Sequence, residues 1–216
     1  MLPEIHTFGV FLAAAYLLGA FLFWRQGRRE GFASDDLLDL LFLCSLAGLL
    51  GGRVLFLVLA GRNIDPTGLL KLGEGFLWVG ALIGAIAVIY PFVSAKKWSF
   101  FRIADVAVCA LAAAQAVGYL GRDLTAGFTV FPYLLSGYFI LGIVLFLGRR
   151  RVLPGIPFFA YLFFSGLLIY LFETTYPVTG LLLVIAGMMG GIAFGLSFWL
   201  KRSKRSFFSR KLENNK

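Results

Sequence analysis

The sequence predicts an all-α protein that crosses a membrane seven times. Of its 216 residues, 60% are hydrophobic and only 14% are charged, whereas soluble domains are about 45–50% apolar and about 25% charged. A soluble domain of this length has no core large enough for so much apolar surface. The 24 Phe, 8 Tyr and 4 Trp residues exclude a disordered chain, because solvated coils contain few large apolar rings.

Seven apolar segments approach the roughly 20 residues that a helix needs to cross a hydrocarbon layer of about 30 Å. They cover residues 8–24, 37–59, 76–93, 103–120, 130–147, 156–172 and 178–200. Turn-forming residues separate them: residues 63–68 follow the second segment, Pro154 precedes the sixth and Pro177 precedes the seventh. Apolar runs of this length favour helices over the strands of a transmembrane barrel.

Lysine and arginine are distributed unevenly over the predicted loops. The first, third and fifth loops carry three each and residues 201–216 carry seven, so 16 of the 20 lie on one side. Because cytoplasmic loops are basic, we expect an outer N-terminus, a transmembrane domain over residues 1–200 and a basic cytoplasmic tail over 201–216. The net charge of +9 then reflects membrane topology, and nucleic acid is not an expected partner.

Several classes of site and function are disfavoured by what the sequence contains. Cys44 and Cys109 lie in apolar segments without paired spacing and His6 is the single histidine, so no disulfide, metal site or cofactor is predicted. No cleavable signal peptide is expected, because the first residues lack a basic region. No repeat or broken helix suggests a transporter, and the seventh segment has no lysine for a retinal Schiff base.

Arg53 is the deepest ionisable residue of the predicted spans. An unpaired arginine at mid-span costs at least about 2.5 kcal/mol on insertion scales, so we expect an anionic partner. A structural ion pair between helices is one interpretation. The phosphate of a lipid headgroup is the other, because a guanidinium binds phosphate through two hydrogen bonds.

Other polar residues lie near the predicted outer surface or within the spans. Gln115 is expected to hydrogen-bond a neighbouring helix or to line a polar cavity. Glu173 is either a solvated carboxylate or the partner of Arg53 or Arg122. His6 is either an exposed interfacial histidine or a catalytic base.

Short motifs follow one another along the seven segments and carry a resemblance to a known family. They are Ile5-His6-Thr7-Phe8-Gly9, Leu50-Gly51-Gly52-Arg53, Gly80-Ala81-Leu82-Ile83-Gly84, Gln115-Ala116-Val117-Gly118-Tyr119-Leu120-Gly121-Arg122, Phe131-Pro132 and Glu173. The chain resembles the prolipoprotein diacylglyceryl transferases, which are seven-helix bacterial enzymes. The resemblance implies transfer of a diacylglyceryl group from phosphatidylglycerol to a lipobox cysteine of a prolipoprotein signal segment, with release of glycerol phosphate, in the bacterial inner membrane.

The residue types depart from the family motifs at several positions. The family's helix-1 tyrosine falls on Phe8, its histidine on Val79, its signature arginine on Tyr119 and its signature asparagine on Arg122. Arg122 follows Tyr119 by three residues on nearly the same helix face, so it is a candidate to replace that arginine.

The resemblance implies two groups of site residues and assigns no catalytic residue. Arg53, Arg122 and Glu173 are the candidates for binding phosphate or a lipid headgroup. The candidates for lining or supporting the cavity are Phe8, Val79, Gln115, Gly118, Tyr119 and Gly121. A non-catalytic relative that binds lipid or lipoprotein, or has a structural role, is the alternative function.

Overall fold

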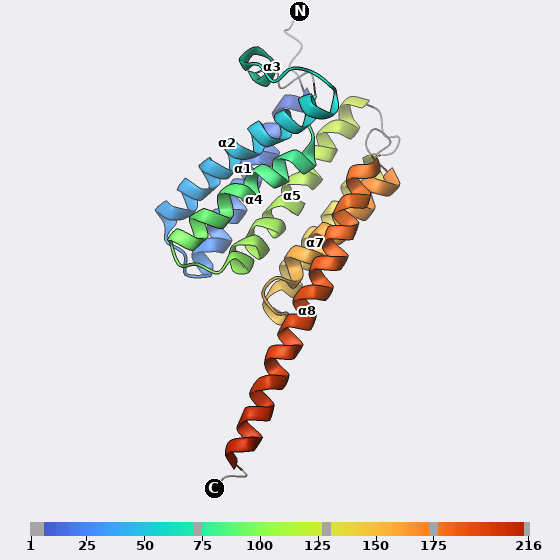
Figure 1. Cartoon of the computed structure of the whole chain (residues 1–216). Coiled ribbons are helices and arrows are strands. Elements are labelled where there is room, and N and C mark those ends of the chain that lie inside the picture. Colours follow the sequence, from blue (N-terminus) through green and yellow to red (C-terminus); the bar gives the residue numbers. More distant parts are fainter. Residues whose placement is uncertain (1–6, 71–74, 127–130, 173–176, 214–216) are drawn as a thin grey trace, which may run out of the picture. The chain divides into compact units, whose positions relative to one another are not determined.

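The computed structural model describes residues 7–70, 75–126, 131–172 and 177–213. These residues are largely helical and include no β-strand, which confirms the predicted all-α fold (Figure 1). In chain order the helices are α1 (Thr7–Arg29), α2 (Ser34–Leu59), α3 (Pro66–Leu70), α4 (Trp78–Ala95), α5 (Phe100–Ala126), α6 (Phe131–Gly148), the 3-10 turn η2 (Arg149–Arg151), α7 (Ile156–Phe172) and α8 (Pro177–Glu213).

Five of the described helices, α1, α2, α4, α5 and α8, are long and apolar enough to cross a membrane. The apolar parts of α6 and α7 are shorter, at residues 133–148 and 156–172. Large apolar side chains stay exposed along these helices, as lipid-facing surfaces require; Phe42, for example, is 68% exposed. The chain is therefore a multi-pass helical membrane protein.

Several helices extend beyond the apolar segments from which they were predicted. The first helix continues to Arg29, α2 begins at Ser34 and α5 spans Phe100–Ala126. The reason is physical: hydropathy marks the part of a helix that fits the hydrocarbon layer, whereas the hydrogen-bond ladder continues into the polar interface. The last helix has 37 residues and is about 55 Å long at 1.5 Å per residue, so it includes most of the predicted tail at 201–216.

The chain divides into two compact units, one of residues 16–110 and one of Met1–Ala15 with Leu111–Lys216. The boundaries fall inside α1 and inside α5. In the first unit, a cluster of buried apolar residues from α1, α2, α4 and α5 forms the core. Its members are Phe23, Leu37, Leu40, Ile89, Val93, Ile103, Val106 and Ala110.

Helices α2 and α4 of this unit lie side by side and meet at glycines (Figure 1). A Cβ atom added to Gly51 would lie 2.5 Å from the carbonyl oxygen of Gly80, and one added to Gly84 would clash with the backbone of Ala47. The two backbones therefore touch directly. Glycine contacts of this kind are common where membrane helices pack closely.

Helices α7 and α8 of the other unit form a similar contact. A Cβ atom on Gly166 would lie 2.6 Å from the backbone nitrogen of Val184, and one on Gly187 would lie 2.6 Å from that of Phe163. Two glycine-lined seams thus hold pairs of helices at the closest distance that their backbones allow.

The end of α4 has an unusual backbone conformation. Lys97 has a φ of +56°, while its amide and that of Trp98 donate to the carbonyls of Ser94 and Val93 at 3.2 and 2.8 Å. This is the pattern of a Schellman cap, whose left-handed position is most often glycine. A lysine therefore occupies a conformation that side chains other than glycine adopt at a cost.

Candidate functional site

The Gly-Gly-Arg motif near the end of α2 has a different contact for each residue. Gly51 faces the backbone of α4, as described above. Gly52 leaves room for the ring of Phe76, and its carbonyl accepts the backbone N–H of Leu77 at 3.2 Å. The motif therefore attaches Phe76 and Leu77, which lead into α4, to the side of α2. Arg53 is the next residue of the motif.

Arg53 is completely buried and holds two downstream glycines. Its Nε donates to the carbonyl oxygen of Gly68 at 2.7 Å, and its Nη1 donates to that of Gly75 at 2.8 Å. The guanidinium carbon also lies 5.3 Å from the ring centroid of Phe56, within the range of a cation–π interaction. Arg53 thus fixes the segment between α2 and α4.

Gly75 is required at its position for two reasons. Its φ is +148°, which L side chains rarely adopt, and an added Cβ atom would overlap the ring of Phe56. The absence of a side chain lets the backbone carbonyl of Gly75 reach Arg53.

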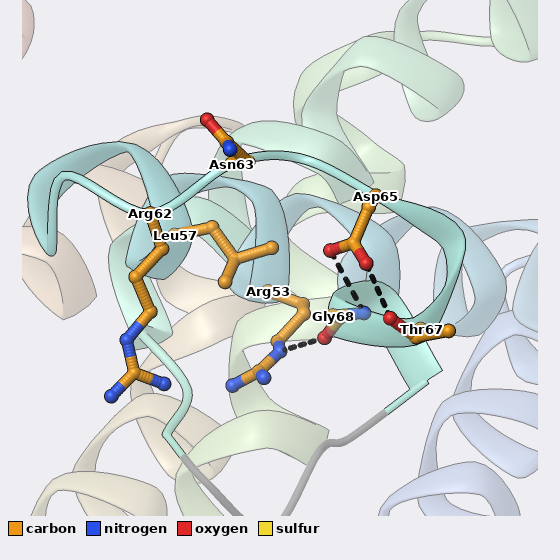
Figure 2. Close-up of a pocket in the computed structure, with 7 residues that line it drawn as sticks. All are labelled: Arg53, Leu57, Arg62, Asn63, Asp65, Thr67 and Gly68. Carbon is orange, nitrogen blue, oxygen red and sulfur yellow. Dashed lines mark hydrogen bonds between the residues drawn. The ribbon is translucent and has the colours of Figure 1, made fainter.

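A pocket of about 360 Å³ adjoins this arrangement at the end of α2 (Figure 2). Its lining residues are Arg53, Leu57, Arg62, Asn63, Asp65, Thr67 and Gly68. Figure 2 shows the side chains of Arg62 and Arg53 extending toward the same side of the pocket. The lining combines two guanidinium groups, an amide and a hydroxyl group with the carboxylate of Asp65, which accepts hydrogen bonds from Thr67 and Gly68. The two arginines and the amide are suited to binding an anion such as a phosphate ester.

Local sequence explains the loop that forms one wall of this pocket. Gly61 has a φ of +64° at the end of α2, and the amide of Arg62 donates to the carbonyl of Leu57 at 2.9 Å, which closes the helix. Asp65 begins α3: its side chain accepts the amide of Gly68 at 3.1 Å and the hydroxyl of Thr67. The sequence analysis placed only a break here, although an aspartate followed by a proline is a recognised helix start.

Arg122 lies in the other unit, near the end of α5. It is partly buried, and its guanidinium carbon lies 5.9 Å from the ring centroid of Tyr119. The Tyr119 ring is itself stacked on that of Tyr138 from α6, with centroids 5.4 Å apart and planes at 8°. Tyr119 therefore contacts both a tyrosine of α6 and an arginine one turn further along its own helix.

Side-chain hydrogen bonds also join α5, α6 and α7 in this unit. The hydroxyl groups of Tyr138 and Ser165 lie 2.8 Å apart, and the hydroxyl of Tyr161 donates to Oε1 of Gln115 at 2.7 Å. Tyr138, Ser165 and Tyr161 are completely buried. Gln115 thus makes an interhelical hydrogen bond, as expected for a polar side chain in a membrane span.

The remaining predicted site residues have varied surroundings. An added Cβ atom on Gly121 would clash with Phe11 of α1, whereas one on Gly118 would meet nothing within 4 Å. Val79 is half-buried at the second position of α4, and only the backbone of Phe8 is described, in α1. Glu173 and His6 lie outside the described residues.

Three of the polar residues that line the pocket were not predicted from the sequence: Arg62, Asn63 and Thr67. They are exposed and lie in a stretch that hydropathy marks only as a loop. The signal that could have found them is their position, because they follow the Gly-Gly-Arg motif at the same end of α2.

Comparison with known proteins agrees with the motifs. The sequence model of the family described as prolipoprotein diacylglyceryl transferase matches residues 2–124. This region contains the Gly-Gly-Arg motif, the pocket loop and the stretch from Gln115 to Arg122.

Individual relatives have the same name, phosphatidylglycerol–prolipoprotein diacylglyceryl transferase. The protein from Clostridium tetani is 28% identical over 120 residues, which are 55% of this chain and 48% of the relative. A relative from Clostridium perfringens, whose name ends in the number 2, is 29% identical over 121 residues, which are 55% of this chain and 47% of the relative. A protein from Thermoanaerobacter sp. is 27% identical over 191 residues, or 80% and 74%. The matched region is therefore about half the length of the first two relatives.

Proposed function

The chain belongs to the prolipoprotein diacylglyceryl transferase family, and from this membership we propose that it transfers a diacylglyceryl group from phosphatidylglycerol to a prolipoprotein cysteine. In this reaction the cysteine sulfur bonds to the terminal glyceryl carbon while the bond between that carbon and the phosphate oxygen breaks. Glycerol phosphate leaves, and the thiol proton passes to a base. The departing phosphate needs cations around it.

The proposed topology has seven crossings, over residues 8–24, 37–59, 76–93, 103–120, 130–147, 156–172 and 178–200. The N-terminus lies outside the bacterial inner membrane, and the basic residues of 201–216 lie in the cytoplasm, since 16 of 20 basic residues are on that side. This orientation puts the pocket beside Arg53 at the outer end of α2, where the donor headgroups and the prolipoprotein cysteine are accessible.

The observation that carries the proposal is the pair of arginines at this pocket. Arg53 is the arginine of the family-like Gly-Gly-Arg motif, and Arg62 lines the same pocket. We assign the phosphate of phosphatidylglycerol to this pocket. In the other unit, Arg122 is a candidate for binding a lipid headgroup, in place of the family's signature arginine, and Glu173 is a further candidate.

Two substitutions favour a second candidate function, a non-catalytic relative that binds the same lipid. Val79 and Tyr119 stand where the family has a histidine and an arginine, and the Tyr119 ring packs against another tyrosine. A chain of this kind would retain the lipid pocket without the groups that move protons.

Complementation separates the two candidates. The gene is expressed in cells depleted of their own transferase, and lipidation of a reporter prolipoprotein is measured. Restored lipidation establishes the transferase, whereas its absence, combined with retention of phosphatidylglycerol by the purified protein, establishes the binding protein. Arg62→Ala tests the pocket in either case: the side chain is exposed, and we expect at least about a tenfold loss of phosphatidylglycerol binding. Unchanged binding would remove the pocket from the proposal.

A further inference from the structure

We propose that Tyr119 is a positioning residue, which holds the guanidinium group of Arg122 where it binds the phosphate of a lipid headgroup, and that Tyr138 and Ser165 lock Tyr119 in place. The inference rests on the proposed function, because it gives Arg122 a headgroup to bind. It adds residues from α6 and α7 that neither the family motifs nor the pocket beside Arg53 include.

The first step is the contact between Tyr119 and Arg122. The guanidinium carbon lies 5.9 Å from the ring centroid, which is within reach of a cation–π interaction. The two residues are three positions apart on α5, so they share a helix face. An arginine side chain has several rotatable bonds, and a fixed ring beside it reduces the number of positions that the guanidinium group samples.

The second step is the stack of Tyr119 on Tyr138. The ring planes differ by only 8° and the centroids lie 5.4 Å apart, which is the offset-stacked geometry that aromatic pairs prefer. Tyr138 is completely buried and comes from α6. The position of the Tyr119 ring is therefore fixed by a different helix from the one that carries it.

The third step is the hydroxyl group of Tyr138. In an apolar surrounding this group needs a hydrogen-bond partner, and the hydroxyl of Ser165 on α7 lies 2.8 Å away. The bond fixes the rotation and depth of the Tyr138 ring, and through it the ring of Tyr119. Three helices thus contribute to the position of one guanidinium group.

The last step is the space beside Arg122. Gly118 lies four residues before Arg122, on the same face of α5, and an added Cβ atom there would meet nothing within 4 Å. The surface of α5 is therefore open at Gly118, one helical turn before Arg122. This is the space that the headgroup and the upper glyceryl part of a lipid would need.

The test measures lipid preference with the full-length protein in nanodiscs of phosphatidylcholine that contain graded fractions of phosphatidylglycerol. Lipids retained after purification give the ratio of phosphatidylglycerol to phosphatidylcholine. We expect Tyr119→Leu to lower this preference about five- to tenfold, while Tyr119→Phe, which keeps the ring, stays within about twofold of the wild type. Phosphatidylcholine retention and the thermal midpoint serve as measures of folding.

A matched control comes from a second aromatic stack on α6. The ring of Tyr133 is stacked on that of Phe172 with centroids 5.3 Å apart and planes at 11°, and among the described residues no arginine lies over this pair. Tyr133→Leu removes a stack of the same kind and should leave the lipid preference unchanged. An equal loss of lipid preference in Tyr133→Leu would mean that removal of any aromatic stack on α6 lowers the preference by disturbing the fold. That result would overturn the inference.

The lock on Tyr138 is tested by milder changes, which keep the fold. Tyr138→Phe and Ser165→Ala each remove one side of the hydrogen bond, and each should lower the preference about two- to threefold. The double variant should be no worse than either single one, because both remove the same bond. If the losses of lipid preference in the two single variants add in the double variant, Tyr138 and Ser165 act independently, and their proposed role in fixing Tyr119 is refuted.

Arg122→Ala separates failure of this inference from failure of the proposed function. If Arg122→Ala abolishes the preference but Tyr119→Leu does not change it, the headgroup role of Arg122 stands and the positioning role of Tyr119 is refuted. If the wild type itself shows no preference, the proposed function fails and the inference with it. Inorganic phosphate is added as a competitor to test whether the phosphate group of the lipid is what the protein recognises. Weaker competition in Tyr119→Leu than in the wild type would support the positioning of Arg122 by Tyr119.

Discussion

Arg53 of α2 donates from Nη1 to the carbonyl oxygen of Gly75 at 2.8 Å, which joins two residues 22 positions apart in the chain. Its Nε makes the corresponding bond to Gly68, 15 positions away, at 2.7 Å. A single buried side chain therefore holds two points of the segment between two membrane helices, Gly68 in α3 and Gly75 shortly before α4. The charge of Arg53, its planar shape and the direction of its donors all contribute to this arrangement.

Replacement of Arg53 by lysine tests the importance of that shape. Lysine keeps the charge but donates from one atom at the end of a flexible chain, so it cannot reproduce bonds from Nε and Nη1 together. We expect Arg53→Lys to destabilise the protein by about 1–3 kcal/mol, the usual cost of an unsatisfied buried polar group. Thermal or denaturant unfolding in detergent micelles measures the loss.

Arg62→Lys is the matched control, because Arg62 is exposed at the same pocket. It should change the free energy of unfolding by less than about 0.5 kcal/mol. Equal effects of the two lysine variants would show that Arg53 acts as a charge alone.

The glycine seam between α2 and α4 predicts a strong effect of a single methyl group. A Cβ atom on Gly51 would lie 2.5 Å from the carbonyl oxygen of Gly80, so Gly51→Ala forces the two helices apart. We expect a loss of about 1–3 kcal/mol, as for other overpacked contacts. Gly195→Ala in α8 is the control, since its Cβ atom meets nothing within 4 Å and alanine favours helix. A Gly51→Ala variant as stable as Gly195→Ala would contradict the close contact.

The hydrogen bond between Tyr161 and Gln115 predicts a measurable coupling between α5 and α7. In a double-mutant cycle with Tyr161→Phe and Gln115→Leu, the interaction energy should lie between about 0.6 and about 1.7 kcal/mol, the average and the maximum for hydrogen bonds inside membrane proteins. The 2.7 Å separation favours the upper part of that range. Strictly additive single effects would show that the two groups do not interact in the folded state.

The left-handed conformation of Lys97 predicts a stabilising substitution. Lys97→Gly relieves a backbone conformation that costs about 1–2 kcal/mol for L residues, so the unfolding temperature should rise. The neighbouring Lys96 has a φ of −83° and is the control, because glycine there costs conformational entropy and removes the ion pair of Lys96 with Asp36 without relieving strain. We expect the unfolding temperature to rise in Lys97→Gly and to fall in Lys96→Gly. A change in the same direction in both variants would contradict the cap.

Hydropathy predicted the existence of the long helices but not their ends. The α5 segment was expected at 103–120 and forms a helix over Phe100–Ala126, because residues such as Arg102 and Arg122 continue the helix into the interface. Composition reports where the hydrocarbon ends, whereas helix ends depend on caps. The short α3 was missed for the same reason, although Asp65-Pro66 carried its signal.

The site was predictable in part. An arginine within an apolar segment is a clear sign that a partner exists, and the sequence identified Arg53 on that basis. The carbonyls of Gly68 and Gly75 were not predictable as partners, because a backbone oxygen has no sequence signature and both residues are distant along the chain. The phosphate-binding roles of Arg53, Arg122 and Glu173 stay predictions, and the lipid-binding measurement on Arg122→Ala addresses that of Arg122.

The dependence of Arg53 on residues that follow it has a consequence for how the protein is made. Synthesis proceeds from the N-terminus, so α2 leaves the ribosome before Gly68 and Gly75, which are 15 and 22 residues behind Arg53. During that interval the arginine faces the insertion cost of an apolar surrounding without these two acceptors. Stable entry of α2 into the bilayer is therefore expected to depend on the arrival of Gly68 and Gly75.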